Sequence, residues 1–280
     1  MNAIEIKNLC KAYKDFKIDN LSFTLPGGCI LGLVGENGAG KSTTIKLILD
    51  IVKKDSGSIS VLGRDNQDSF EITKDEIGVV LDEVGFNDCF TVKDIDKIMS
   101  YSYKNWSSAE FIKLIKRFSL PLNKKFKEFS KGMKMKLGIA VALSHNAKLL
   151  ILDEATSGLD PVVRDEITDV FMEFTRDENH SILISSHIVS DLEKICDYIA
   201  FIHNGRLMLC EEKDRLKDEY ALVSCDEKQF EALEQSAIIG VRRNRYSVDA
   251  IVKRSEMLIG IDGKPITIEE LFVFMVKGEK

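Results

Sequence analysis

A glycine-rich segment at 35–42, with the sequence GENGAGKS, constrains the fold of this chain more than any other feature. It matches the G-x-x-x-x-G-K-[ST] pattern of phosphate-binding loops. The apolar run from Cys29 to Val34 precedes it, and a segment with helical periodicity begins at Lys41. Glycines let successive N–H groups point at one centre, and a helix N-terminus adds unpaired donors. The sequence therefore predicts a strand, a phosphate-binding loop and a helix, in that order.

Two side chains of this loop are expected to have direct chemical roles. Lys41 can neutralise the β- and γ-phosphates of a nucleotide, and the Ser42 hydroxyl can hold Mg²⁺. The nucleotide-binding residues expected in and beside the loop are Gly35, Glu36, Asn37, Gly38, Ala39, Gly40, Lys41, Ser42 and Thr43.

A second apolar run, at 149–152, leads into two acidic residues. This pattern is typical of a buried parallel strand whose carboxyl end opens on a cleft. Asp153 is expected to reach Mg²⁺ through oxygen, and Glu154 to activate water as a general base. Ser181 to Ser185 predicts another buried strand. His187 follows it and is a candidate for touching a γ-phosphate, although a lone histidine is more often structural.

Two helices are predicted close to these strands. Pro161 suits the first position of a helix, and apolar residues recur at helical spacing from Ile167 to Phe174. Ser130 is a good N-cap for a second helix over 131–143, and the N-terminus of that helix is a second possible anion site. The other interpretation of the second helix is a plain capped helix with solvated lysines.

These segments, in this order, resemble the ATPase subunits of ABC transporters. The matching parts are the Walker A loop at 35–42, the signature at 129–133, the Walker B strand at 149–153, the D-loop at 157–160 and the switch histidine, His187. The resemblance covers residues 1–215, and the signature SKGMK is similar to that of bacterial single-domain ATPases of the ABC-2 export type.

The resemblance implies an α/β P-loop NTPase fold with a mixed sheet core and an N-terminal antiparallel β-subdomain. A helical subdomain is expected as an insert at about 86–143. Short strand and helix patterns predict a small α+β accessory domain at 216–280. That domain is either a structural cap on the ATPase or a regulatory or dimer-contacting module.

In the resembled family, two ATPase domains sandwich two ATP molecules. The resemblance therefore implies that Ser130, Lys131, Gly132 and Asp160 contact a nucleotide bound to the other protomer. It also implies that Tyr13 stacks on adenine, for which its π-face is suited. The alternative for Tyr13 is an aromatic side chain on a half-buried antiparallel strand.

The sequence departs from the family pattern at three positions. Lys131 stands where the family has its first signature glycine, and Met133 stands where it has glutamine. Asp82 follows the predicted strand at 77–81, where the family has the Q-loop glutamine. The Asp82 carboxylate either ligates Mg²⁺ or is a solvated loop acid.

Local patterns mark the helical insert and the end of the ATPase region. Capping boxes are expected at Thr91 to Asp94 and at Ser107 to Glu110, and another at Thr267 to Glu270. Asn204-Gly205 between two apolar runs is a type I′ hairpin signal. The aromatic residues between the insert's helices are either interface anchors or subdomain core; they are Tyr101, Tyr103 and Trp106.

Composition limits the possible functions. The net charge of −6 argues against a general nucleic-acid binder. No run reaches the roughly 18 apolar residues of a membrane span, and the N-terminal residues have no signal-peptide core. Six dispersed cysteines are expected to be reduced thiols in a cytosolic protein.

The function expected from these features is ATP binding and hydrolysis that drive export through a separate integral membrane permease. The cofactors are ATP and Mg²⁺, and the partners are the permease and a second ATPase protomer, with no nucleic acid expected. The location implied is cytoplasmic, peripheral at the inner face of the cell membrane. Two alternatives are a soluble ABC ATPase acting on nucleic acid or ribosomes, and a weakly active regulatory partner in a heterodimer.

Overall fold

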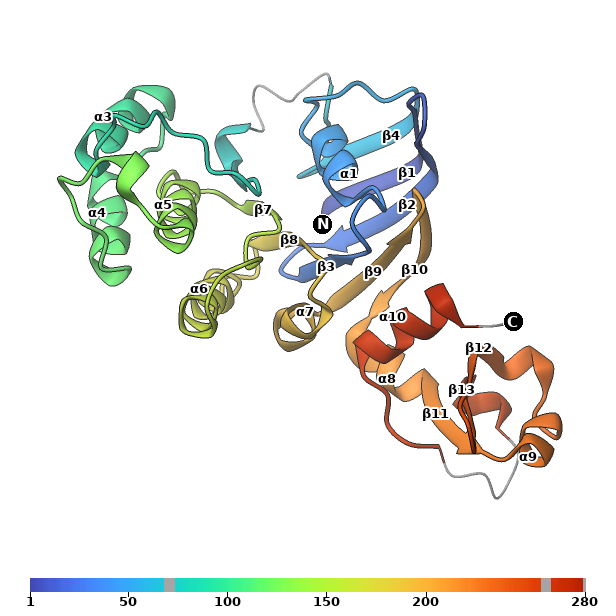
Figure 1. Cartoon of the computed structure of the whole chain (residues 1–280). Helices are drawn as coiled ribbons and strands as arrows, with labels where there is room; N and C mark the ends of the chain where they lie inside the picture. The colour runs from blue at the N-terminus through green and yellow to red at the C-terminus, as the bar shows by residue number, and fades with distance from the viewer. Residues whose placement is uncertain (68–73, 258–262, 279–280) are drawn as a thin grey trace.

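A six-stranded sheet forms the centre of the molecule in the computed structural model, which describes residues 1–67, 74–257 and 263–278 (Figure 1). The strand order is β10-β9-β3-β8-β7-β6, and β10 alone runs antiparallel to its neighbour. The predicted mixed sheet is therefore confirmed. Its strands are β3 (Ile30–Val34), β6 (Ile77–Val80), β7 (Leu149–Asp153), β8 (Ser181–Ser186), β9 (Tyr198–His203) and β10 (Arg206–Glu212).

Every residue of β3, β7 and β8 is buried. Parallel strands covered on both faces read as continuous apolar runs, which is why these three were visible in the sequence. Their carboxyl ends meet at one edge of the sheet, where the phosphate-binding loop and the two acidic residues follow.

An antiparallel sheet with the order β2-β1-β4-β5 covers one face of the central sheet. Residues of this sheet and of helix α1 (Lys41–Ile48) share a buried cluster with Leu31, Leu33 and Ile151 of the central strands. The predicted N-terminal antiparallel sheet is therefore confirmed. Its strands are β1 (Asn2–Ala12), β2 (Lys17–Pro26), β4 (Ser56–Val61) and β5 (Arg64–Asp65).

Helices cover the other face of the central sheet, where Ile30, Leu150 and Ile182 join a second buried cluster. These helices are α5 (Lys131–Leu143), α6 (Pro161–Phe174), α7 (Val189–Ile195) and α10 (Ile268–Lys277). An apolar face was expected on α5, but the helix buries almost every residue from Met135 to Ala142.

The helical insert contains α3 (Val92–Ser102) and α4 (Ser108–Arg117) ahead of α5. Thr91 makes the predicted capping box with Asp94, whereas Ser107 makes one half of its box by accepting from the Glu110 amide. Tyr101 is 82% exposed. Tyr103 and Trp106, the other two aromatic residues between the helices, are packed against neighbouring rings: the Tyr103 ring stacks 4.1 Å from His145, and the Trp106 ring lies 5.2 Å from Phe111.

The chain closes with a three-stranded antiparallel sheet of order β11-β13-β12. It has a small core of its own, which includes Val223, Phe230 and Ala250. The predicted capping box of Thr267 and Glu270 is confirmed at the start of α10. The remaining elements are α8 (Lys213–Glu219), β11 (Tyr220–Cys225), α9 (Glu227–Glu231), β12 (Ile238–Arg243), β13 (Val248–Lys253) and short 3₁₀ turns at 74–76, 126–128, 235–237 and 254–256.

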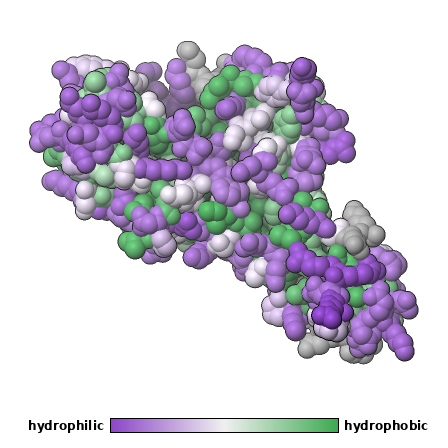
Figure 2. Space-filling view, viewed as in Figure 1, coloured by the Kyte–Doolittle hydropathy of each residue, from purple (hydrophilic) through white to green (hydrophobic). Residues whose placement is uncertain are grey.

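Hydrophilic side chains cover most of the face seen in Figure 2, and hydrophobic residues show there as smaller separate patches. Among the helices of the described ranges, none has the length and hydropathy needed to span a bilayer.

Candidate nucleotide-binding site

The glycine-rich loop connects β3 to α1, as the sequence predicts. Its tip, at 36–38, is exposed, whereas Gly35, Ala39 and Gly40 are buried. Gly38 and Gly40 have φ angles of 82° and 115°, which glycine adopts without strain. A Cβ at Gly40 would also lie 2.7 Å from Ile18 Cδ1. Backbone conformation and close packing therefore both require glycine where the loop enters the helix.

The β9–β10 hairpin braces the loop from outside. Asn204 and Gly205 have φ angles of 47° and 73°, which confirms the predicted type I′ turn. The Gly205 amide donates to the Ala39 carbonyl at 2.9 Å, and the Ala39 amide donates to the Glu36 carbonyl at 3.1 Å. The hairpin thus holds the loop at Ala39, just before α1, whose first N–H groups have no partner within the helix.

Lys41 is the first residue of α1 and is 4% exposed. Its ammonium donates to the carbonyls of Gly35 at 2.8 Å and Glu36 at 3.3 Å, and it lies 3.3 Å from Glu154 Oε1. The charge of Lys41 is therefore held inside the curve of the loop, where phosphate oxygens would replace these carbonyls as its partners.

The two acidic residues after β7 face different surroundings. Asp153 is 4% exposed, and its Oδ1 accepts from the Ser185 hydroxyl at 2.5 Å. Glu154 has a φ of 53°, a left-handed conformation that costs a non-glycine residue roughly 1–3 kcal/mol. The Glu154 amide donates to the Ser185 carbonyl and hydroxyl, both at 3.1 Å. Ser185 therefore fixes the strained turn that presents the Glu154 side chain.

His187 completes this arrangement from the end of β8. Its Nδ1 lies 2.7 Å from Glu154 Oε2, while Lys41 approaches the other oxygen of the same carboxylate. The structure thus brings Lys41, Asp153, Glu154 and His187 to one edge of the sheet.

Sequence reasoning missed Ser185 as a site residue. The signal was a serine at the end of a buried strand next to the strand that carries the acids. It also missed an ion pair behind the site, in which Arg164 of α6 donates to the Asp191 carboxylate of α7 at 3.1 Å. Asp191 accepts from Thr156 at 3.2 Å, and Arg164 donates to the Leu159 carbonyl at 3.2 Å. This network ties the D-loop to the helix that follows His187.

The signature residues lie beside the D-loop of their own chain. The Ser130 hydroxyl caps α5 by accepting from the Met133 amide at 3.2 Å. The Lys131 ammonium would lie 3.1 Å from a Cβ at Gly158, and Gly132 faces Val163 of α6. These residues are exposed or partly exposed, so the surface they form is open to a second molecule.

Asp160 also lies at this surface, at the start of α6. Its carboxylate caps the helix by accepting from the amides of Val162 and Val163 at 3.1 Å and 3.0 Å. Its part in nucleotide binding stays a prediction.

Tyr13 lies in the turn between β1 and β2 and is 45% exposed. Its amide donates to the Phe16 carbonyl at 2.8 Å, and the Phe16 ring packs against Gly40. The turn therefore lies against the phosphate-binding loop, with the Tyr13 ring partly open to solvent.

Asp82 follows β6, the strand that pairs with β7, and is exposed at the same carboxyl edge of the sheet. It lines a cavity of about 510 Å³ together with Phe129, Lys131 and Lys134. In the part of the chain that the structure describes, no three His, Cys, Asp or Glu side chains form a metal-binding group. The Asp82 carboxylate thus shares a cavity with the signature lysines, and its role as a metal ligand stays a prediction.

The remaining donors suit Mg²⁺. Ser42 is exposed at the first turn of α1 and offers a hydroxyl, and Asp153 offers a carboxylate beside the loop. Two oxygen donors from the protein are enough for Mg²⁺, because this ion usually keeps several of its bound waters.

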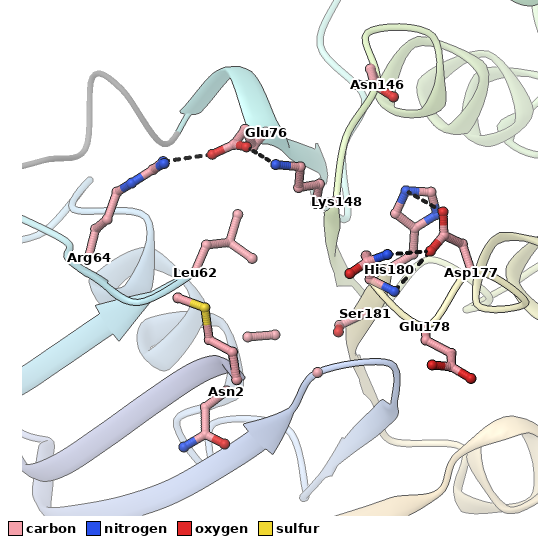
Figure 3. A pocket seen from close by; sticks show the side chains of 14 residues that line it. Asn2, Leu62, Arg64, Glu76, Asn146, Lys148, Asp177, Glu178, His180 and Ser181 are labelled. Carbon is pink, nitrogen blue, oxygen red and sulfur yellow. Dashed lines mark hydrogen bonds and ion pairs between the residues drawn. The ribbon is translucent and has the colours of Figure 1, made fainter.

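A cavity of about 610 Å³ lies at the opposite edge of the sheet, near the amino ends of β6, β7 and β8 (Figure 3). Glu76 there accepts from Arg64 at 2.6 Å and also from Lys148. Arg64 and Lys148 are thus both paired with Glu76. The groups suited to a triphosphate, the glycine-rich loop and Lys41, lie at the carboxyl edge instead.

A family model described as ABC transporter matches residues 18–157. This chain belongs to the ABC transporter family. It is an ATP-binding subunit of that family, and its activity is ATP hydrolysis.

Known proteins of this family match different shares of this chain. The lantibiotic transport ATP-binding protein SrtF of Streptococcus pyogenes is 37% identical over 75% of this chain and 91% of its own length. The uncharacterized ABC transporter ATP-binding protein YhcH of Bacillus subtilis is 29% identical over 98% of this chain and 89% of its own. A solved ATP-binding subunit of an ABC transporter aligns with a TM-score of 0.70 at 29% identity, covering 77% of this chain and 92% of that one.

Proposed function

We propose that two ATPase protomers of this kind close over Mg²⁺ and ATP and thereby drive export through a separate membrane permease. The observation that carries the proposal is the Glu154 carboxylate, which lies 3.3 Å from Lys41 and 2.7 Å from His187. A carboxylate between two cationic or proton-sharing groups, at the mouth of a phosphate-binding loop, suits a general base for water.

In this proposal each residue has a separate task. Lys41 and the amides of the loop hold the phosphates, and Tyr13 stacks on the base. Glu154 takes a proton from water as the water oxygen bonds to the γ-phosphorus and the bond to the bridging oxygen breaks. His187 orients Glu154 and contacts the γ-phosphate. Mg²⁺ held by Ser42 and Asp153 would offset phosphate charge.

The surface around the signature residues completes the nucleotide site of the other protomer in this proposal. Ser130, Lys131, Gly132 and Asp160 would contact ATP bound to the other protomer, because they lie together at the exposed starts of α5 and α6. Loss of the γ-phosphate would remove the charge that bridges the two protomers and release them.

The permease, the location and the direction of transport form the rest of the proposal. The SrtF relative is named for lantibiotic transport, which supports a transport role, and the export direction rests on the resemblance to the ABC-2 type. The chain would then act at the cytoplasmic face of the cell membrane, next to its permease.

Replacing Glu154 by glutamine tests the proposal. Glu154→Gln removes the base but keeps the size and backbone of the side chain, so hydrolysis should slow about 10²–10⁴-fold while ATP still binds. Phosphate release and nucleotide affinity are measured in the presence of Mg²⁺. Near-normal turnover would exclude Glu154 as the base.

Two controls accompany this test. Glu231→Gln, at an exposed position on α9, should change neither quantity. The Glu154→Gln protein should also form ATP-dependent dimers and co-purify with a polytopic membrane protein when the two are expressed together; co-purification with ribosomes instead would contradict the transport proposal.

A further inference from the structure

The C-terminal helix α10 reaches the nucleotide-binding region from the accessory sheet. Figure 1 shows it beside α8 and the end of β10. Phe272 of α10 packs against Phe201 of β9 with ring centroids 5.1 Å apart, and both side chains belong to the main buried cluster. β9 pairs with β3, the strand that leads into the phosphate-binding loop. The helix therefore rests on the strands beneath the loop.

Both ends of α10 are fixed in place. At its start, the Ile268 amide donates to Glu193 of α7 at 3.3 Å, and Lys217 lies 2.7 Å from the same carboxylate. At its end, the Gly278 amide donates to the Phe274 carbonyl at 2.8 Å, and a Cβ at Gly278 would lie 2.8 Å from Gly240 Cα. These contacts place the backbone of Lys277, one residue earlier, while its side chain is 68% exposed.

Lys277 is directed at the phosphate-binding loop. Its ammonium lies 4.0 Å from Glu36 Oε1, in the exposed tip of the loop. The other oxygen of Glu36 lies 3.7 Å from His203 Nδ1, a buried ring nitrogen with no hydrogen-bond partner among the described residues. Asn204 lies 2.8 Å from the second ring nitrogen of His203. Glu36 is thus the point where the loop, the hairpin and α10 meet.

Glu36 brings a negative charge into a loop that receives a triphosphate. The Glu36 carboxylate repels nearby phosphate oxygens, and a cation paired with Glu36 reduces this repulsion. We infer that Lys277 of α10 is a positioning residue for nucleotide binding, which balances Glu36 so that the loop keeps its affinity for ATP. The inference rests on the nucleotide site proposed above and gives the accessory segment a role in it.

The test is a double-mutant cycle in the full chain. Lys277→Ala should weaken ATP binding about two- to five-fold, the range expected for an exposed ion pair, with little change in kcat. In a Glu36→Gln background, the same change should have no effect on affinity. Equal weakening in both backgrounds, or none in either, would overturn the inference.

Matched controls separate this effect from general changes in charge. Lys228→Ala removes an exposed lysine from α9 of the same accessory segment and should leave affinity unchanged. High salt should shrink the difference between wild type and Lys277→Ala, because the Debye length falls to about 3 Å at 1 M. An undiminished difference at high salt would count against a charge effect.

A chemical measurement tests the contact without activity. A zero-length carbodiimide reagent should join Lys277 to Glu36, and the linked peptides should disappear in Glu36→Gln. The Lys11–Asp55 pair, 2.7 Å apart, serves as an internal positive control. Linkage of that pair without linkage of Lys277 would overturn the inference. These tests compare nucleotide affinity and cross-linking between the variants and the wild-type protein. Slow hydrolysis by the wild-type protein would therefore count against the proposed function and would leave this inference unaffected.

Discussion

Ser185 is a single hydroxyl on which both acidic residues of the site depend. It donates to Asp153 at 2.5 Å and accepts from the Glu154 amide at 3.1 Å. Asp153 is almost fully buried, and a buried carboxylate that loses a donor keeps its desolvation cost. One small side chain thus supports the carboxylate proposed to bind Mg²⁺ and the turn that carries the proposed general base.

Ser185→Ala should therefore destabilise the protein by about 1–3 kcal/mol and lower ATPase activity. Urea denaturation and phosphate release measure the two effects. Ser190→Ala, at an exposed position on α7, is the control and should be neutral. A loss of stability equal to that of the control would show that Ser185 does not support the site.

His145 gives the protein a pH response at the residue scale. It is 1% exposed, with Nδ1 3.2 Å from the Val141 carbonyl and Nε2 3.1 Å from the Ile77 carbonyl. Burial lowers the pKa of His145 below its ordinary value of 6.5, although the two carbonyls act in the opposite direction. The unfolded chain therefore binds the proton more readily than the folded protein does.

The contribution of His145 to the free energy of unfolding should therefore be constant above pH 6.5. It should decrease as the pH falls below 6.5 toward the lower pKa of His145 in the folded protein. Melting temperatures between pH 7.5 and 5.5 measure this response. His145→Gln removes the titrating group, so its melting temperature should change less over the same range. If the melting temperatures of the two proteins changed equally with pH, His145 would be excluded as the source of the pH response.

At the scale of elements, α6 and α7 are joined by Arg164 and Asp191 behind the site. Asp191 is 8% exposed, and Arg164 Nε is buried without a hydrogen-bond partner among the described residues. Asp191 is thus the main charged partner of Arg164, and the pair fixes the D-loop relative to His187.

Asp191→Ala should cost about 1.5–3 kcal/mol, since it leaves a partly buried guanidinium without its carboxylate. Asp191→Asn keeps an oxygen for Thr156 and Arg164 and should lose less stability. Thermal unfolding compares the two, and kcat for ATP should fall more in Asp191→Ala than the Michaelis constant rises. Equal losses in both variants would show that the charge of Asp191 carries the whole effect and that a neutral acceptor oxygen cannot replace any part of it.

Elements with a local signal were predictable from the sequence. The buried strands before Lys41 and before Glu154 are continuous apolar runs, and the glycine loop has a diagnostic spacing of glycine, lysine and serine. Contacts between distant segments were not predictable. The bond from Ser185 to Asp153 depends on the order of the strands in the sheet, and the approach of Lys277 to Glu36 depends on how α10 packs on that sheet; no local pattern specifies either.

At the scale of the whole molecule, the accessory segment shares the main core. Phe272, Leu271 and Ile268 of α10 belong to the same buried cluster as the central strands, although the three-stranded sheet also has a core of its own. Because α10 connects the two, we expect the ATPase region and the accessory segment to unfold together.

Calorimetry should therefore show one cooperative transition for the full chain. Phe272→Ala should lower the stability of that single transition by about 3–5 kcal/mol, the usual cost of removing a buried phenylalanine. Separate transitions for the two parts, with only one shifted by the substitution, would contradict a shared core.

The placement of α10 has a practical consequence for handling the protein. Lys277 lies beside Glu36 at the carboxyl edge of the central sheet, whereas Met1 lines the cavity at the amino edge. A bulky amine-reactive label on Lys277 would therefore crowd the phosphate-binding loop and weaken nucleotide binding. The same label on Lys148, at the amino edge, would be separated from that loop by the length of β3, about 16 Å.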